Sequence, residues 1–189
     1  SPFYSQRPLS SLLLQIDRET AAVQASGCMI GSMTLSSAQG GELSCSVDLE
    51  AAGMGSVTAG SPTFTASDAP YLHQEATFAL NGTNDNSITA FSITINNNLG
   101  ADLWGTSLQR IDIPAGKQVV TGTFSKLFDD TTERNAFLNS QVRSFKASYV
   151  RSGASLIVWC PKVRYNTHPE NISGQSEHII ETFNFTAYV

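Results

Sequence analysis

Hydrophobic and polar residues alternate along several short stretches of the chain, and residues 88–99 show this most clearly. Phe91, Ile93 and Ile95 are each separated by one polar residue. A period of two residues is typical of a β-strand that buries one face and exposes the other to water. The run ends on three consecutive asparagines at 96–98, which favour turns, so we predict that the strand ends there.

A pair of similar runs follows Gly27. Residues 29, 31, 33 and 35 share one predicted face of the first run, and apolar residues occupy every other position of the second run, at 43–49. A stretch of small, turn-forming residues with two adjacent glycines joins the runs. This arrangement predicts a β-hairpin.

More strands are predicted along the rest of the chain, around residues 71–80, 117–124, 145–149, 156–160 and 182–189. In one of them, Gly122 lies between Val120 and Phe124, which suggests a bulge or a close approach of the backbone. About seven or more strands with frequent turns predict an all-β fold, either a β-sandwich or a barrel.

One α-helix is predicted on the flank of this fold. It begins near Asp130, where Asp130 and Glu133 fit a capping box with Asp in place of Ser or Thr, and acidic residues suit the positive end of the helix dipole. Residues 136–138 provide its apolar side, and it should end around Ser140. We therefore interpret Asp130 and Glu133 as helix-capping residues and not as an acid–base pair.

Two stretches depart from the strand pattern. Residues 1–26 are predicted to form an N-terminal arm with a strand or a short helix, and residues 27–189 to form the β-sandwich domain. Residues 51–70 are rich in small residues, hold one charge and are too long for an ordinary connection, so we predict a long loop that packs on a neighbouring molecule. The candidate contact residues of this loop are Gly53, Met54, Val57, Thr63, Phe64 and Asp68.

The chain is short of charged residues, which make up 14% of it against about 25% in an ordinary soluble domain. Either Ser, Thr, Asn and Gly keep the surface soluble, or other subunits cover much of it. The net charge of −5 and the pI near 5.1 argue against a protein that grips nucleic acid, since phosphate contacts need clustered Lys and Arg.

The three cysteines, Cys28, Cys45 and Cys160, have no metal-type spacing. Their odd number, with no secretory leader in view, predicts reduced thiols in a cytosolic folding compartment, where they act as small buried residues. Cys28 and Cys45 lie on neighbouring predicted strands and could face each other, so their pairing stays open at this point.

No residues with catalytic or metal-binding spacing stand out. The turn at 81–86 lacks the alternating acids of a calcium loop. Trp104 and Trp159 could form part of a sugar platform, but without nearby carboxylates we interpret them as packing residues. The histidines lie far apart along the chain, at His73, His168 and His178. We therefore predict no enzymatic activity, no cofactor and no metal ion.

Several short segments have a characteristic order and spacing. They are 27–35 (Gly-Cys-Met-Ile-Gly-Ser-Met-Thr-Leu), 44–49 (Ser-Cys-Ser-Val-Asp-Leu), 91–99 (a strand ending on the Asn triplet), 113–117 (Ile-Pro-Ala-Gly-Lys), 120–124 (Val-Thr-Gly-Thr-Phe), 127–130 leading to 137–139, and 161–165 (Pro-Lys-Val-Arg-Tyr). Together, over roughly residues 27–189, they resemble the tail tube (major tail) proteins of long-tailed bacteriophages.

This resemblance implies a β-sandwich with a flanking helix, and subunits that join into rings, usually of six, which stack into a hollow tube. Genomic DNA passes through such a tube during infection, without sequence-specific binding. The implied partners are other copies of the chain, a tape-measure protein and tail terminator and baseplate proteins. The implied location is the virion, after assembly in the host cytoplasm and without membrane insertion. Many family members carry an additional preceding domain, where this chain has about 26 residues.

Two other functions fit the same sequence. One is the inner-tube protein of a related contractile device, such as a secretion system or a tailocin, which uses a similar fold. The other is a monomeric β-sandwich binding module, which would present an aromatic-lined cleft and stay monomeric when concentrated. A hydrolase on a β scaffold would need a nucleophile and a base, and the sequence offers no such pair.

Overall fold

The computed structural model describes residues 10–18, 21–58, 60, 69–100, 103–104, 110–151, 153–167 and 179–188. Its elements are β1 (Leu12–Arg18), β2 (Ala21–Ala38), β3 (Ser44–Glu50), β4 (Gly53–Val57), a 3₁₀ turn (His73–Glu75), β5 (Ala76–Leu80), β6 (Thr83–Asn84), β7 (Ile88–Asn96), β8 (Leu103–Trp104), β9 (Arg110–Asp112), β10 (Val119–Leu127), α1 (Thr132–Leu138), β11 (Arg143–Arg151), β12 (Ala154–Thr167) and β13 (Ile180–Ala187).

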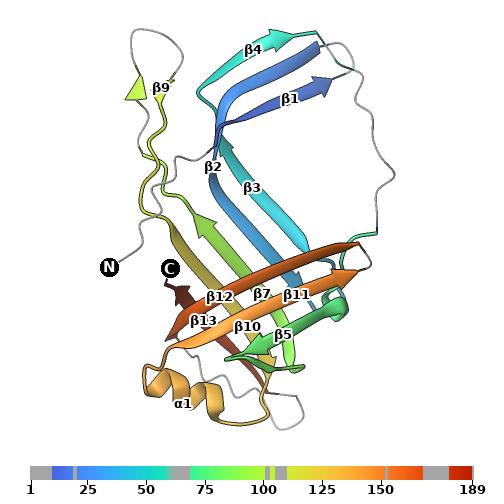
Figure 1. The fold of residues 1–189 in the computed structure, drawn as a ribbon, viewed down its shortest axis with the longest axis vertical. Helices are drawn as coiled ribbons and strands as arrows, with labels where there is room; N and C mark the ends of the chain where they lie inside the picture. The colour runs from blue at the N-terminus through green and yellow to red at the C-terminus, as the bar shows by residue number, and fades with distance from the viewer. Residues whose placement is uncertain are drawn as a thin grey trace.

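The strands form one antiparallel sheet of 11 strands in the order β1-β2-β7-β10-β13-β12-β11-β5-β6, with β3 and β4 also paired to β2. β8 and β9 form a separate pair. α1 lies at the lower end of the molecule in Figure 1. The predicted fold class, all-β with a single flanking helix, is confirmed.

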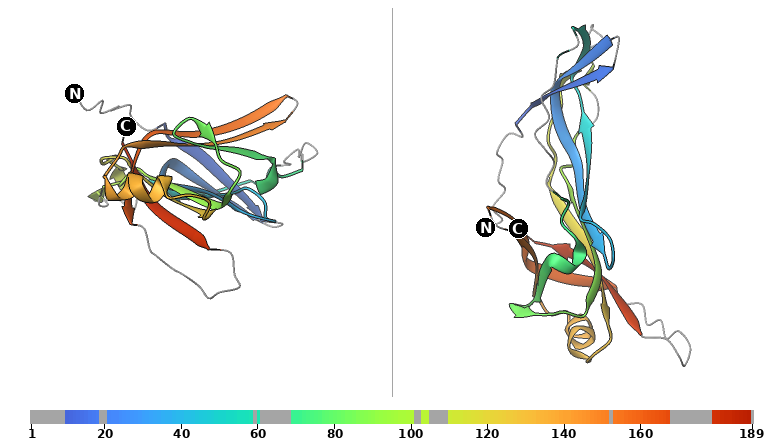
Figure 2. Two further views of the ribbon diagram at one scale, coloured as in Figure 1. Left: turned by 90° about the horizontal axis from the view of Figure 1, so that it is seen from below. Right: turned by 90° about the vertical axis from the view of Figure 1, so that its right-hand side faces the viewer.

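The sheet folds over on itself, so that β5, β11 and β12 cover the lower part of β7, β10 and β13 (Figures 1 and 2). Aromatic side chains fill the space between the two layers. The ring centroids of Phe124 and Phe183 are 5.1 Å apart, and those of Phe124 and Phe145 are 5.7 Å apart. We call this two-layered part the sandwich.

Gly122 lies in the middle of β10, opposite Phe185 of β13. A Cβ atom at Gly122 would lie 2.4 Å from Cζ of Phe185, so the Phe185 ring occupies the place of a side chain. The register of β10 is regular at Gly122, which excludes a bulge there. Of the two alternatives for this glycine, the close approach is confirmed.

β2 keeps its apolar side chains on one face over its whole length because it contains two β-bulges. The register skips one residue of β2 near Gly27 and another at Gly31. As a result, Ile30 and not Met29 shares a face with Met33, and the alternation predicted for residues 29–35 is wrong at its first position. A bulge shifts the side chains that follow it to the other face, and two bulges in one strand restore the original side.

The N-terminal half of β2 leaves the sandwich and pairs with β1 on one side and β4 on the other. We call β1, residues 21–28 of β2 and β4 the extension, which forms the upper end of the molecule in Figure 1. The part of the predicted arm that the structure describes consists of β1 and the start of β2, so it is strand and not helix. β4 also occupies part of the predicted loop at 51–70, because pairing with residues 22–26 satisfies its backbone. The predicted domain limits, 1–26 and 27–189, stay a prediction.

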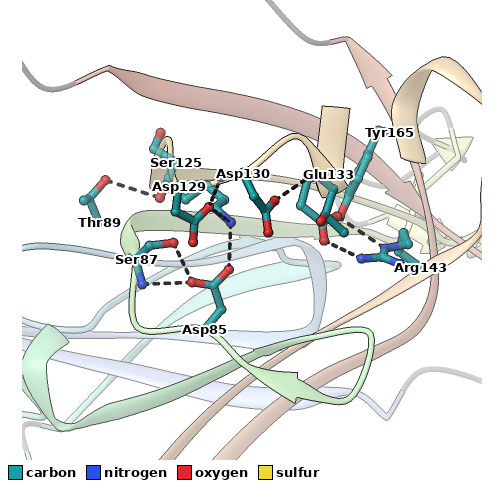
Figure 3. Close-up of polar contacts among 11 residues, drawn as sticks. Asp85, Ser87, Thr89, Ser125, Asp129, Asp130, Glu133, Arg143 and Tyr165 are labelled. Carbon is teal, nitrogen blue, oxygen red and sulfur yellow. Dashed lines mark hydrogen bonds and ion pairs between the residues drawn. The ribbon is translucent and has the colours of Figure 1, made fainter. Parts of the chain in front are cut away.

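Thr131, and not Asp130, occupies the N-cap position of α1 and makes no side-chain cap hydrogen bond, so the capping box predicted for Asp130 and Glu133 is not formed. α1 begins at Thr132, whose backbone N–H donates to Oδ1 of Asp130 at 2.8 Å. Glu133 does not reach back to the backbone. It is buried and binds Arg143 and Tyr165 instead (Figure 3), so the capping-box role predicted for it is wrong.

The three cysteines are free. Cys28 lies opposite Leu12 and Cys45 lies opposite Leu35, at different levels of β2, so they do not face each other. Cys28 and Cys160 are buried as expected, whereas Cys45 is exposed.

Candidate assembly surfaces

One face of the extension is apolar and open to solvent. Leu14, Ala25 and Met54 lie side by side across its three strands, and Ile16 and Val23 form the next row. The exposed fractions are 37% for Leu14, 46% for Ile16 and 70% for Met54. A sheet buries its apolar face against a second layer, and the described residues provide none here.

The other face of the extension is polar and partly covered by the chain that follows β4. Gln15 donates from Nε2 to Oδ1 of Asp17 at 2.7 Å and to the Thr58 carbonyl at 3.5 Å. The backbone N–H of Gly60 donates to Asp17 Oδ1 at 3.5 Å. The segment after β4 thus covers part of this face, whereas no described segment covers the apolar face.

The junction between the extension and the sandwich is tightly built. Gly27 has φ +61°, and a Cβ atom there would lie 3.0 Å from Cβ of Ala52. The backbone N–H of Ala52 donates to the Ser26 carbonyl at 3.1 Å, and that of Arg110 donates to the Ala52 carbonyl at 2.9 Å. Arg110 also binds Glu50, with Nη1 and Oε2 2.7 Å apart. These contacts fix the direction in which the extension projects.

β3 is an edge strand with both faces exposed. It pairs with β2 on one side only. Cys45, Val47 and Leu49 lie on the core face of the sheet, yet the second layer does not reach them, and the exposed fractions of Val47 and Leu49 are 41% and 37%. Such an edge offers backbone groups and apolar side chains to another chain.

The outer face of the main sheet carries small hydroxyl and amide side chains, and we call it the hydroxyl face. In one row, Thr34, Thr94 and Thr121 are paired across β2, β7 and β10, and the hydroxyls of Thr34 and Thr94 are 2.9 Å apart. The side chains that we include in it are uncharged, and the charged residues Asp48 of β3 and Arg164 of β12 lie at its borders. The hydroxyl face consists of Thr34, Ser36, Ala90, Ser92, Thr94, Thr121, Thr123, Ser125, Thr182, Asn184 and Thr186.

The outer face of the second layer has a different character. Val150, Ile157 and Trp159 are exposed on it, and Trp159 lies opposite Lys146. A groove of about 180 Å³ runs beside Trp159, which is its only aromatic residue among small and polar neighbours. The aromatic-lined cleft that a carbohydrate-binding module would need is therefore not formed by these residues. The side chain of Trp104 lies outside the described residues.

A buried lysine on β10 ties the segment before α1 to the turn between β6 and β7, and Figure 3 labels its two partners, Asp85 and Asp129. Nζ of Lys126 lies 3.0 Å from Oδ2 of Asp85 and 2.8 Å from Oδ1 of Asp129. Burial alone would lower the pKa of Lys126, but its hydrogen bonds to Asp129 and Asp85 outweigh it and raise this pKa. Burial would raise the pKa of Asp85, but hydrogen bonds from Ser87 and Lys126 lower it overall. Lys126 thus acts as a structural ion-pair residue.

A second buried pair holds the first turn of α1. Arg143 of β11 donates from Nε to Oε2 of Glu133 at 3.3 Å, and the Tyr165 hydroxyl donates to the same carboxylate. Burial, together with the negative charge of Glu133, raises the pKa of Tyr165. Sequence reasoning missed this role of Glu133, because its partners are distant in the chain.

Ser37 and His73, which are distant in the sequence, form a hydrogen bond in the structure. Nε2 of His73 lies 3.1 Å from the Ile88 carbonyl, which can only accept, so Nδ1 accepts from the Ser37 hydroxyl at 2.8 Å. The Tyr149 hydroxyl then donates to Ser37, at 2.8 Å. Ser37 and His73 are buried in the sandwich, so this chain of hydrogen bonds stabilises the core.

Arg151 holds the chain where it returns to the sandwich before β5. Nη2 of Arg151 lies 2.6 Å from Oε2 of Glu75 and donates to the Pro70 carbonyl at 2.6 Å, and the guanidinium lies 4.6 Å from the centre of the Tyr71 ring. The hydrogen bond from Arg151 is the main cause that lowers the pKa of Glu75. This clamp fixes the end of the 51–70 segment.

Of the residues predicted for neighbour contacts, Gly53, Met54 and Val57 lie on β4, and Met54 is the most exposed large apolar side chain described. Thr63, Phe64 and Asp68 lie outside the described residues, as do His168 and His178.

Within the described ranges, no group of three or more His, Cys, Asp or Glu side chains is placed to hold a metal ion. No described helix has the length and apolar character needed to cross a membrane.

The chain matches the family model described as phage tail tube protein, over residues 2–187. The match includes most of residues 1–26, which the resemblance seen in the sequence did not cover. A comparison with curated proteins gave no match. The family is a structural one, located in the virion tail, and its members assemble as oligomers with other tail components. Because the match covers nearly the whole chain, the protein belongs to the phage tail tube family.

Proposed function

We propose that copies of this chain assemble into rings of six subunits, that the rings stack into a hollow tail tube, and that genomic DNA passes through its channel. The extension makes the contact between successive rings through its apolar face, where Met54 lies, and Gly53, Val57, Thr63, Phe64 and Asp68 contribute from the rest of the 51–70 segment. Assembly takes place in the host cytoplasm around a tape-measure protein, and terminator and baseplate proteins close the two ends.

The observation that carries this proposal is the uncovered apolar face of the extension. It continues the core face of the main sheet along β2, but the second layer covers only the lower part of that sheet (Figure 2). The exposed Leu14, Ile16 and Met54 would be unfavourable in a permanent monomer, whereas a neighbouring copy removes them from water. The open edge of β3 supports lateral contacts within a ring in the same way.

The hydroxyl face suits the wall of a channel for DNA. A phosphate backbone binds where Lys and Arg side chains cluster, and the hydroxyl face has no such cluster, with Arg164 alone paired at its border. Its neutral side chains would let DNA slide without a strong attachment. With a net charge of −5 per chain, a ring of six carries on the order of thirty negative charges, which adds a weak repulsion.

Electron microscopy of the purified protein tests the assembly. We expect hollow filaments of constant width, or stacked rings, at high protein concentration, and class averages of end views give the number of subunits. A particle that stays monomeric at every concentration, in light scattering and in micrographs, would contradict the proposal.

The channel wall is tested by adding positive charge to it. We expect tubes of a T94K/T121K variant to retain added DNA at low salt, whereas wild-type tubes release it. A T77K/S148K variant is the matched control, because Thr77 and Ser148 are paired on the outer face of the second layer. If the control variant retained DNA inside the tube and T94K/T121K did not, the channel assignment would be wrong.

A further inference from the structure

The outer face of the second layer combines exposed apolar residues with positive charge. Val150, Ile157 and Trp159 of the β11–β12 hairpin, orange in Figure 1, are 67%, 53% and 64% exposed. In the register of the two strands Lys146 is opposite Trp159, so it lies beside the indole on the same face. Monomeric soluble proteins rarely leave large apolar side chains gathered in this way, so the face is a candidate for an interaction surface.

A β-bulge in β12 adds a second lysine to this face. The register skips one residue of β12 between Cys160 and Val163. Both of these side chains are buried in the core, so the two residues between them, Pro161 and Lys162, point outward and are exposed. We call Lys146, Val150, Ile157, Trp159 and Lys162 the hairpin face.

The two lysines of the hairpin face have no acidic partner among the described residues. Neither Lys146 nor Lys162 forms an ion pair there. The acids that flank β5 and β6, Glu75 and Asp85, each already bind another cation. The chain as a whole has a net charge of −5, so the hairpin face is a local excess of positive charge on an acidic protein. Its charge is complementary to that of an acidic partner.

The groove of about 180 Å³ beside Trp159 is suited to a carboxylate. The hydroxyls of Thr77, Ser144 and Ser148 and the ammonium group of Lys146 line it, and none of its lining residues is acidic. An ammonium group only donates hydrogen bonds and a hydroxyl can donate one, so these groups favour a negatively charged acceptor. The indole of Trp159 provides an apolar wall for the stem of the incoming side chain. An Asp or Glu side chain has both features.

We propose that the hairpin face binds a second, different protein, whose contact surface carries Asp or Glu among apolar side chains and places one carboxylate against Lys146. Trp159 and Ile157 form the apolar centre of this contact. On β11 and β12 serines lie opposite Ile157 and Val150, and this mixture of polar and apolar side chains favours a protein surface over lipid.

This inference rests on the proposed tube, in which the hydroxyl face lines the channel. The two layers of the sandwich pack core against core, so the hairpin face points away from the hydroxyl face and toward the outside of the tube (Figure 2). Copies that meet at the extension and at the edge of β3 do not use the hairpin face. The bound protein therefore covers the exterior of the tube.

Labelling of an added thiol measures whether the hairpin face is covered. In a Cys45→Ser background, which removes the exposed native thiol, Ile157→Cys is assembled into tubes from the purified chain and, separately, into complete tails in infected cells. Cys28 and Cys160 are buried and stay unreacted in the folded protein. A water-soluble maleimide should label the tubes, and the complete tails should lose most of this labelling. Equal labelling of tubes and tails would overturn the proposal.

A zero-length carbodiimide, which joins an amine to a carboxylate in contact with it, tests the chemistry of the partner. In complete tails we expect Lys146 to be linked to Asp or Glu of another protein, as read by mass spectrometry, and Lys146→Gln to lose that link. Lys117 is the matched control, because it is exposed but precedes β10 and lies outside the hairpin face, and it should not link to the same protein.

The remaining outcomes are also decisive. Links from Lys146 only to carboxylates of this chain would mean that a second copy occupies the face, and loss of I157C labelling without any link from Lys146 would mean that the partner is not acidic. Either result overturns the proposal. If the wild-type chain forms no tubes, the proposed function itself fails; if it forms tubes but complete tails are labelled as strongly as tubes, only the docking surface is wrong.

Discussion

The sandwich and the extension share strand β2 but differ in what lies over their apolar faces. In the sandwich, Phe124, Phe145 and Phe183 are at most 1% exposed between two layers. In the extension, Leu14 and Met54 are 37% and 70% exposed on a single layer. The sandwich is thus complete as a folded unit, whereas the extension resembles one half of a core that a partner has to complete.

This difference shows how one strand can serve folding and assembly together. Val23 and Ala25 face the same side of β2 as Met33 and Leu35, because the two bulges compensate each other. The apolar face therefore runs from the sandwich into the extension without a change of side. Substitutions in the two regions should separate the free energy of unfolding from the ability to assemble, and we order them by their effect on unfolding.

The largest effect is expected in the middle of the sandwich. Phe124 contacts the rings of Phe145, Phe183 and Phe185, so Phe124→Ala leaves a large cavity. We expect a loss of about 4 kcal/mol in the free energy of unfolding, enough to unfold much of the protein. Denaturant titration followed by circular dichroism measures it. A loss below about 1 kcal/mol would mean that these rings do not form the core.

The next effect is expected from the buried charge near α1. Among the described residues, Lys126 is the only cation that contacts both Asp85 and Asp129. Lys126→Met removes this cation and leaves the largely buried carboxylate of Asp85 without its positive partner. Breaking a buried pair in this way costs about 3 kcal/mol. Asp129→Asn is the matched control, since Asp129 is half exposed and should cost about 0.5 kcal/mol or less. Equal effects of the two variants would contradict the buried pair.

A smaller effect is expected at the junction. Gly27→Ala places a side chain at φ +61° and 3.0 Å from Cβ of Ala52, which costs roughly 1–2 kcal/mol. The strain acts where the extension leaves the sandwich, so we expect slower assembly and faster hydrogen exchange in residues 21–26, with little change in the sandwich. Gly40→Ala is a control, because Gly40 also has positive φ but no atom lies within 4 Å of the added Cβ.

The buried pair also predicts a dependence on pH. The folded state lowers the pKa of Asp85 below its ordinary value of 3.8, so this stabilisation is present above about pH 4 and is lost as the pH falls further. The pKa of Lys126 is raised above 10.5, so its contribution is present below that pH and is lost as the pH rises through the folded value. Urea titrations of Asp85→Asn should show a weaker fall in stability below pH 4 than the wild type, and an unchanged acid limb would contradict this role.

The sequence was sufficient to predict strands whose pattern is local. Phe91, Ile93 and Ile95 alternate strictly, and they form β7 with its apolar side buried or half-buried. β4, in contrast, contains two glycines and one valine, so its propensity is low, and it becomes a strand only because β2 is long enough to pair with it. Gly27 and Gly31 were similarly ambiguous, since a glycine within a strand pattern can mark a break or a bulge.

The assembly surfaces were predictable only in part. Met54 stood out as an apolar residue in a stretch of small ones, and it is the most exposed large apolar side chain described. The hydroxyl face was visible in each strand separately, as Ser or Thr at most of its positions. Its extent depends on the strand order β2-β7-β10-β13, which the chain order does not give. The role of Glu133 depends in the same way on Arg143 and Tyr165, which the fold brings to it.

The smallest effect on unfolding is expected where the effect on assembly is greatest. Met54→Ser and Ile16→Ser change exposed side chains of the extension, so the free energy of unfolding should change by about 0.5 kcal/mol or less. Their partner surface, however, loses apolar contact area at every copy along the tube, and we expect the double variant to remain a folded, soluble protein that forms no long filaments. Val150→Ser is the matched control, because Val150 is equally exposed but lies on the second layer, and it should leave filaments intact. Micrographs and sedimentation at equal protein concentration distinguish the two. Normal filaments from the double variant would show that the uncovered face of the extension is not what holds the copies together.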